Sequence, residues 1–287
     1  MTWLLTTVLL AVGIPAVWAQ QNLVDRGGYA ALSRTAAAAP ELQSAVAQEL
    51  SAQVGRLGYD ADPAVVAGVA AAYTASPSFP GQFAAANALA HRWLFDGAAA
   101  AETPNGPAID FIPLLSDPAF AQTLRDMGAG DMSLPATLSV PIAENAPTWI
   151  RPEALRNVAV WSPWISVALV VLTAVGALLT VSLASSRGKA LAALGVSALL
   201  VGAAGWAGLA SVSSRLVGAL GITSEDMRHI VNAMVAAAAD SAHRWLTVTL
   251  IAGTGLVIVG VLVSLLASLA SAGGRASGAG TRSRARP

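Results

Sequence analysis

Two acid–histidine pairs are the residues in this sequence best suited to chemistry near neutral pH, where histidine titrates. Asp226 precedes His229 and Asp240 precedes His243, each by three positions, in a stretch with helical periodicity. Residues three apart lie side by side on a helix, so each pair could bind a metal ion or orient its histidine. The two pairs are separated by about 21 Å of helix, too far for one ion to bridge them. We therefore expect surface ion pairs or helix caps here, and no metal site.

The other candidates also favour structural roles. Asp60 and Asp62 lack the glycine and the terminal glutamate of a calcium loop, and Asp62 stands where a helix cap is expected. The tetrapeptide His-Arg-Trp-Leu occurs at His91 and again at His243, which indicates a chance match between two alanine-rich helices. Motifs for a serine nucleophile, a zinc protease, a phosphate loop or a dinucleotide site are absent from the sequence. The sequence thus nominates no catalytic, cofactor-binding or metal-binding residue, and we expect no cofactor.

Composition indicates a membrane protein. Of 287 residues, 11% are charged and 55% are hydrophobic, and the mean hydropathy is +0.62. Soluble domains carry about 25% charged residues, and disordered chains have low hydrophobicity. The formal net charge is zero, which argues against a nucleic-acid partner. The chain has no cysteine, and this excludes disulfides, thiolate zinc sites, iron–sulfur clusters and cysteine nucleophiles.

Four stretches without an ionisable side chain could cross a bilayer as helices, namely residues 3–19, 163–184, 190–212 and 246–272. A hydrocarbon core of about 30 Å needs roughly 20 helical residues, so the first stretch is marginal. It could instead be a cleaved signal peptide ending at Ala19, which would leave three spans. We expect an uncleaved anchor over residues 1–19, because the apolar run is longer than the usual core of a signal peptide.

The distribution of charge predicts the orientation in the membrane. The link 185–189 and the tail 273–287 contain bases and no acid, whereas residues 20–162 contain thirteen acids and seven bases. The positive-inside rule then places the link and both termini in the cytoplasm. Residues 20–162 and 213–245 are expected outside the cell. The tryptophans expected at the outer boundaries agree with this orientation: Trp18, Trp149, Trp161, Trp164 and Trp245.

Residues 20–162 are expected to form a mostly helical extracytoplasmic domain with a minor β element. Apolar residues recur at helical spacing in segments 30–39, 41–57, 63–73 and 79–94, with Gly58 a plausible helix end. The second half of this domain is predicted to contain short strands at 108–112 and 134–142 and a helix at 117–127. The fold class is therefore a mainly α polytopic membrane protein, with three spans in residues 163–272 and a disordered basic tail.

An outer helix is predicted at 224–245, capped by Thr223 or Ser224. It should continue without a break into the fourth span and pack on the extracytoplasmic domain through one apolar stripe. The stripe comprises Met227, Ile230, Val231, Met234, Val235 and Ala238.

The predicted spans contain hydroxyl and small side chains but no ionisable group. Transporters and proton relays usually place ionisable groups within the bilayer. We expect the hydroxyls, such as those of Thr173, Thr180 and Thr254, to bond to their own helix or to a neighbour. Stripes of small residues, for example Ala198–Gly202 and Gly260–Ser264–Ser268, favour a compact helix bundle.

Three short strings carry a resemblance to a known group of proteins. They are Asn22-Leu-Val-Asp25, Ala90-His-Arg-Trp-Leu94 and Ala108-Ile-Asp-Phe-Ile-Pro-Leu-Leu115. With the arrangement of spans, the chain resembles a family of uncharacterised integral membrane proteins of actinobacteria. The resemblance implies a bacterial plasma-membrane protein with an exported helical domain, and it implies no activity.

The functional hypothesis is a non-enzymatic membrane protein of the bacterial cell envelope. Its exported domain is expected to bind a partner protein or a lipid, and its spans contact the bilayer. A subunit of a transporter or channel is the first alternative, and an exported enzyme that uses a carboxylate or a histidine is the second. The sequence does not determine the oligomeric state.

Overall fold

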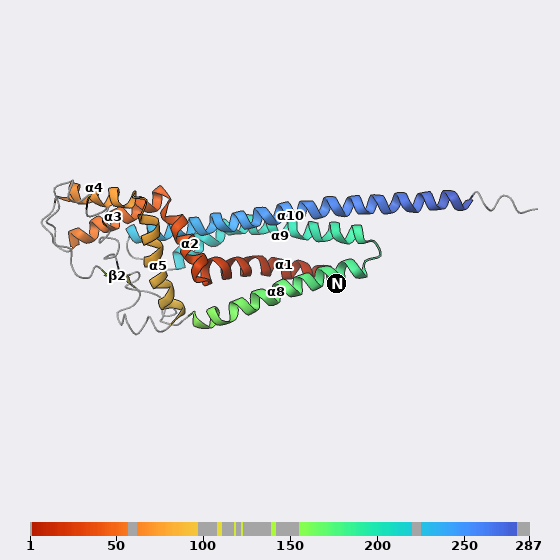
Figure 1. Ribbon diagram of the computed structural model, residues 1–287, viewed down its shortest axis with the longest axis horizontal. Coiled ribbons are helices and arrows are strands. Elements are labelled where there is room, and N and C mark those ends of the chain that lie inside the picture. Colours follow the sequence, from red (N-terminus) through yellow and green to blue (C-terminus); the bar gives the residue numbers. More distant parts are fainter. Residues whose placement is uncertain are drawn as a thin grey trace, which may run out of the picture. The chain divides into compact units, whose positions relative to one another are not determined.

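The computed structural model describes residues 2–56, 62–96, 108–110, 118, 122, 139–141, 155–219 and 225–279 (Figure 1). The described chain is mainly α-helical and divides into two compact units. The first, here called the span unit, comprises Met1–Val17, Ile165–Gly208 and His243–Pro287. The second, here called the helical domain, comprises Trp18–Trp164 and Leu209–Ala242.

Four helices in the described residues are long and apolar enough to cross a membrane, as expected for a multi-pass membrane protein. The first consists of α1 (Thr2–Ala19) and a π-helical turn, η1 (Gln20–Val24), that continues it without a break. Together they form 23 residues, or about 34 Å of helix. The first span is therefore longer than the sequence predicted, because uncharged Gln20–Val24 extends the helix. The others are α8 (Arg156–Leu183), α9 (Arg187–Ala219) and α10 (Glu225–Ala279).

Helix α1 packs antiparallel to α8 in the span unit. A Cβ added at Gly13 would lie 3.9 Å from the Cβ of Leu169, and one added at Gly176 would lie 2.6 Å from the hydroxyl of Thr6. Residues later in α1 therefore contact residues earlier in α8, which is the pattern of two antiparallel helices. The side chain of Thr6 is fully buried, so glycine at 176 lets the two helices approach closely.

Helix α1 runs parallel to α9. The Trp3 indole donates to the carbonyl of Ala193 at 3.1 Å, and the Thr7 hydroxyl donates to the hydroxyl of Ser197 at 2.9 Å. Both contacts join residues in the same order along the two helices. Polar bonds between apolar helices fix their register, since few other polar partners exist in lipid.

A row of glycines joins α9 to α10 in antiparallel contact, and we call this row the glycine seam. A Cβ added at Gly195 would lie 2.7 Å from the carbonyl oxygen of Gly253, and one added at Gly188 would lie 2.6 Å from that of Gly260. A Cβ added at Gly202, one heptad further, would meet Leu250 at 2.8 Å. The helix backbones therefore touch along the seam, and any side chain would separate them.

Two helix ends differ from the sequence prediction. Helix α9 begins at Arg187, inside the segment 185–189 that was expected to be a link, because Arg and Lys are good helix formers. Helix α10 reaches Ala279, whereas the disordered tail was expected from residue 273. Residues 280–287 lie outside the described part of the chain.

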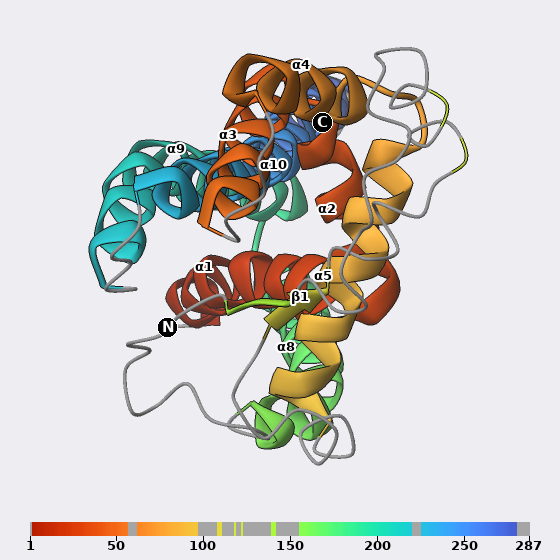
Figure 2. The same ribbon diagram turned by 90° about the vertical axis from the view of Figure 1, so that its left-hand side faces the viewer.

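The helical domain contains α2 (Arg26–Ala37), α3 (Pro40–Arg56), α4 (Pro63–Thr74) and α5 (Phe79–Phe95). These four helices match the predicted segments to within a few residues. Asp62 caps α4 as predicted, because its carboxylate accepts from the backbone N–H of Ala64 at 2.8 Å. Helix α2 packs on α5 and α3 packs on α4 (Figure 2).

The core of the helical domain is aromatic and includes part of α10. Tyr73, Phe79 and Phe83 pack around each other, with ring centroids 5.7 Å apart in each adjacent pair. Met227 and Ile230 of α10 belong to the same buried cluster. This confirms that the stripe on α10 packs on the helical domain. The stripe is rotated from the predicted one, since its other packed members are Ala233, Met234 and Ala237.

A two-stranded antiparallel ladder pairs β1 (Ala108–Asp110) with β2 (Ser139–Pro141). Each strand lies inside a longer segment to which the sequence assigned a strand, and β1 contacts α5. The predicted helix 117–127, apart from residues 118 and 122, lies outside the described residues. The same holds for Gly58 and for the caps Thr223 and Ser224.

Candidate functional site

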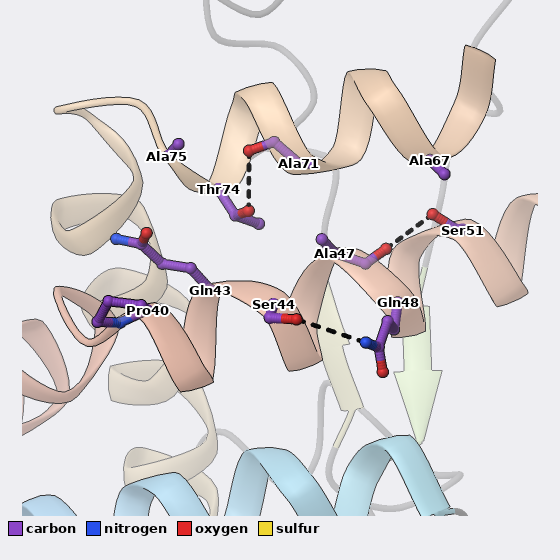
Figure 3. A pocket seen from close by; sticks show the side chains of 10 residues that line it. All are labelled: Pro40, Gln43, Ser44, Ala47, Gln48, Ser51, Ala67, Ala71, Thr74 and Ala75. Atoms are coloured by element: carbon purple, nitrogen blue, oxygen red, sulfur yellow. Dashed lines mark hydrogen bonds between the residues drawn. The ribbon is translucent and has the colours of Figure 1, made fainter. Parts of the chain in front are cut away.

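An open groove of about 500 Å³ lies between α3 and α4 in the helical domain. Figure 3 shows Pro40, Gln43, Ser44 and Gln48 along α3, with α4 above them in this view. Small side chains form the α4 side, so nothing long fills the space between the helices. The residues that line the α4 side of the groove are Ala67, Ala71 and Thr74 of the helix and Ala75 directly after it, and Ala47 and Ser51 complete the α3 side.

The groove is uncharged but can form hydrogen bonds. Two hydroxyls are used within their own helices, since Ser51 donates to the carbonyl of Ala47 and Thr74 to that of Ala71. Gln48 donates weakly to the hydroxyl of Ser44 at 3.4 Å, and both side chains are exposed. Amide and hydroxyl groups of this kind can serve as donors and acceptors for a peptide backbone.

A second polar site surrounds the π-turn η1. Asp25 ends this turn and caps α2, accepting from the N–H of Gly28 at 2.8 Å. A Cβ added at Gly28 would overlap the carbonyl of Gln21, so glycine is required for α2 to pass so close to η1. π-turns are rare and frequently mark functional sites.

His91 on α5 fixes the π-turn from the other side. Its Nε2 lies 3.1 Å from the carbonyl oxygen of Leu23. A carbonyl only accepts, so Nε2 must carry the proton and donate. The imidazole is buried between two rings, with centroids 4.9 Å from Tyr29 and 4.3 Å from Phe95. The ring is thereby fixed in position and orientation.

Burial controls the protonation of this cluster. It lowers the pKa of His91 below its ordinary value, while hydrogen bonds to the carbonyls of Leu23 and Val24 oppose the shift in part. Nearby Arg26 lowers the pKa further and Asp25 raises it. Burial also raises the pKa of Tyr29. Both rings are therefore neutral at pH 7, and His91 holds a carbonyl rather than transferring protons.

A third set of hydrogen bonds links η1 to α10. The Trp18 indole donates to the hydroxyl of Ser241 at 3.3 Å, and that hydroxyl donates to Asn22 Oδ1 at 3.4 Å. Asn22 in turn donates to the carbonyl of Trp18 at 2.9 Å. With His91, these bonds hold the π-turn between α5 and α10.

The acid–histidine pairs of the sequence do not form a site in the described residues. His229 and Asp240 are exposed, and the ring of His243 lies against Trp206 with centroids 4.2 Å apart. The side chain of Asp226 and all of Asp60 lie outside the description. Across the described ranges, no three His, Asp or Glu side chains come close enough to hold a metal ion.

Sequence reasoning missed the π-turn and the role of His91. A signal was present, since Gly27 and Gly28 follow Asp25 and Arg26, and paired glycines often mark close backbone contact. Two of the strings that carry the family resemblance, residues 22–25 and 90–94, meet at this turn. No protein-family model, curated protein or solved structure matches the chain, so that resemblance stays a prediction.

Proposed function

We propose that this chain is a non-enzymatic multi-pass protein of the bacterial plasma membrane whose exported helical domain binds a partner protein. The α3–α4 groove is the binding surface. The observation that carries the proposal is an open groove of about 500 Å³ with amide and hydroxyl groups but no charged lining residue.

The lining of the groove favours a protein partner over a lipid. Anionic headgroups are usually bound by Lys or Arg, and none lines this groove. Small residues such as Ala67 and Ala71 let a second backbone approach, and Gln48 and Ser44 can bond to it. A helix or an extended segment in a groove is a recurring mode of peptide recognition.

The orientation of the spans is part of the proposal. Helices α1, α8, α9 and α10 alternate in direction, which supports termini on one side of the membrane. The basic composition of the tail supports the cytoplasm as that side. The chain has no cysteine, so single cysteines introduced at Ala64 and Ala279 report orientation cleanly. An impermeant thiol reagent on intact cells should label Ala64→Cys and not Ala279→Cys.

The polar side chains of the spans give little support to a transporter. Thr173, Thr180, Thr249 and Thr254 each donate to the carbonyl four residues earlier, and Ser197 donates to Ala193. The prediction that such hydroxyls bond to their own helix or to a neighbouring helix is confirmed for these five, each of which bonds within its own helix. Flux of solutes through proteoliposomes that contain the purified chain alone would favour the transporter hypothesis.

Site-specific photocrosslinking in native membranes tests the partner proposal. A photoreactive residue at Gln48 or at Ala71, on the two sides of the groove, should give one adduct of the same mass. The control position is Thr35, which is exposed on α2 and lies outside the groove. Filling the groove with Ala71→Trp should remove the adduct formed from Gln48.

Adducts of equal yield at Thr35 and Gln48 would contradict the groove as the binding surface. An adduct with the mass of a phospholipid would replace the protein partner with a lipid.

A further inference from the structure

The C-terminal part of α10 extends beyond the helix that it packs on in the span unit. The glycine seam pairs Gly188, near the start of α9, with Gly260 of α10. Helix α10 then continues to Ala279, and α9 begins only one residue before Gly188. Residues 265–279 of α10 therefore have no α9 residue opposite them, over about 22 Å of helix (Figure 1).

The side chains of this extension differ between its two faces. Ser264 and Ser268 continue the stripe that faces α9, and a Cβ at Gly188 would contact the Ser264 hydroxyl. On the opposite face the leucines are open: Leu262 is 54% exposed, Leu266 67% and Leu269 69%. The extension thus has a polar face next to the start of α9 and an apolar face away from it.

Two cations lie beside the polar face. Arg187 and Lys189 flank Gly188, and both are exposed. The first turn of α9 contains no acidic residue, and neither cation forms an ion pair within the part of the chain that the structure describes. Gly188 lies against Ser264, and Arg187 and Lys189 come directly before and after it, about 100° to either side around the helix. We call Arg187, Lys189, Ser264 and Ser268 the basic corner.

The depth of the basic corner in the membrane makes its two positive charges unfavourable unless a counter-ion or water is present. The apolar run of α10 continues to about residue 272, some 18 Å along the helix beyond Gly260. If this run stays in lipid, Arg187 and Lys189 lie closer to the middle of the bilayer than the level at which the apolar run of α10 ends. Charged groups at such depth are costly unless they are paired or solvated.

We propose that the basic corner binds the phosphate headgroup of an anionic phospholipid. The phosphate pairs with Arg187 and Lys189, the hydroxyl of Ser264 adds a hydrogen bond, and the leucines on the far face of α10 remain in acyl chains. Charge complementarity supports this occupant, since both cations lack a described counter-ion. Basic pockets between spanning helices bind anionic headgroups in this manner. The inference does not depend on the partner of the helical domain.

Lipid binding to the full chain in detergent micelles tests the proposal. Native mass spectrometry would measure the affinity for dioleoylphosphatidylglycerol and for dioleoylphosphatidylcholine, which have the same acyl chains but an anionic and a zwitterionic headgroup respectively. We expect tighter binding of phosphatidylglycerol. Each cation near a lipid surface contributes about fivefold in affinity. The variant Arg187→Gln/Lys189→Gln should therefore bind phosphatidylglycerol about 25-fold more weakly.

A matched control removes two charges elsewhere. Arg282→Gln/Arg284→Gln, in the basic tail, should retain the affinity of the parent chain, as should Arg187→Lys/Lys189→Arg. If the double glutamine variant is not monodisperse, the single variants are each expected to lose about fivefold. Equal affinity for the two lipids, equal weakening by the tail variant, or comparable binding of inorganic phosphate alone would overturn the proposal.

Discussion

The contact between α9 and α10 can be tested by adding one methyl group at the glycine seam. In Gly195→Ala the new Cβ would lie 2.7 Å from the carbonyl oxygen of Gly253 and 2.7 Å from the backbone nitrogen of Val257. Ordinary contacts of a Cβ are 3.4–4 Å, and backbone atoms cannot rotate away. The two helices must therefore separate by most of an ångström, and the contacts along the whole seam loosen.

The expected free-energy change has two opposing parts. Overpacking of this kind costs about 1–3 kcal/mol, whereas alanine gains about 1 kcal/mol over glycine in helix propensity. Gly208→Ala on the same helix is the control, because a Cβ there has nothing within 4 Å. The control keeps the propensity gain without the clash. Gly195→Ala should therefore be less stable than Gly208→Ala by about 1–3 kcal/mol.

Reversible unfolding of the full chain in mixed micelles, followed by tryptophan fluorescence, measures this difference. A larger side chain in Gly195→Leu should increase the loss and expand the protein in gel filtration. If Gly195→Ala and Gly208→Ala are equally stable, the backbones of α9 and α10 do not touch, and the reasoning on the seam is refuted.

Three further results are expected. Gly28→Ala should destabilise the helical domain, because the new Cβ would overlap the carbonyl of Gln21. The control Gly68→Ala should not, because a Cβ there has no atom within 4 Å. Thermal unfolding of the two variants measures the difference. Burial lowers the pKa of His91 in the folded protein. Below about pH 6.5, the unfolded chain therefore binds more protons at this residue than the folded chain does. The free energy of unfolding should then decrease as the pH falls toward the pKa of His91 in the folded protein. His91→Gln should flatten that dependence between pH 7.5 and 5. Mass spectrometry of the purified chain should find residues 1–19 retained, and loss of this segment would show cleavage after Ala19.

Local signals made the helices of the helical domain predictable. Asp62 followed by Pro63 marks the start of α4 because the carboxylate satisfies a free N–H and proline has none to satisfy. The apolar stripe on α10 identified Met227 and Ile230 as core residues. Its rotation toward Ala233 could not be predicted, because alanine is packed or exposed depending on how closely the neighbouring helices approach.

The glycine seam and the π-turn were missed because they depend on contacts between segments far apart in sequence. Small residues were sought at spacings of four, whereas Gly188, Gly195 and Gly202 repeat at every seventh position, as do Gly253 and Gly260. A heptad of this kind predicts helices that cross at a small angle. The paired glycines Gly27 and Gly28 mark a close backbone contact but do not specify a π-turn, which also involves the contact of Leu23 with His91 on a distant helix.

The role of α1 follows from its hydrogen bonds. A signal peptide must leave the protein, so the rest of the chain would not be expected to bond specifically to it. Here the Ala193 carbonyl and the Ser197 hydroxyl are bonded by Trp3 and Thr7, and Thr6 is completely buried against Gly176. Removal of α1 would take away the hydrogen bonds that Trp3 and Thr7 donate to α9 and open a gap beside α8. These costs explain why the first helix is expected to remain as a packed span of the mature protein.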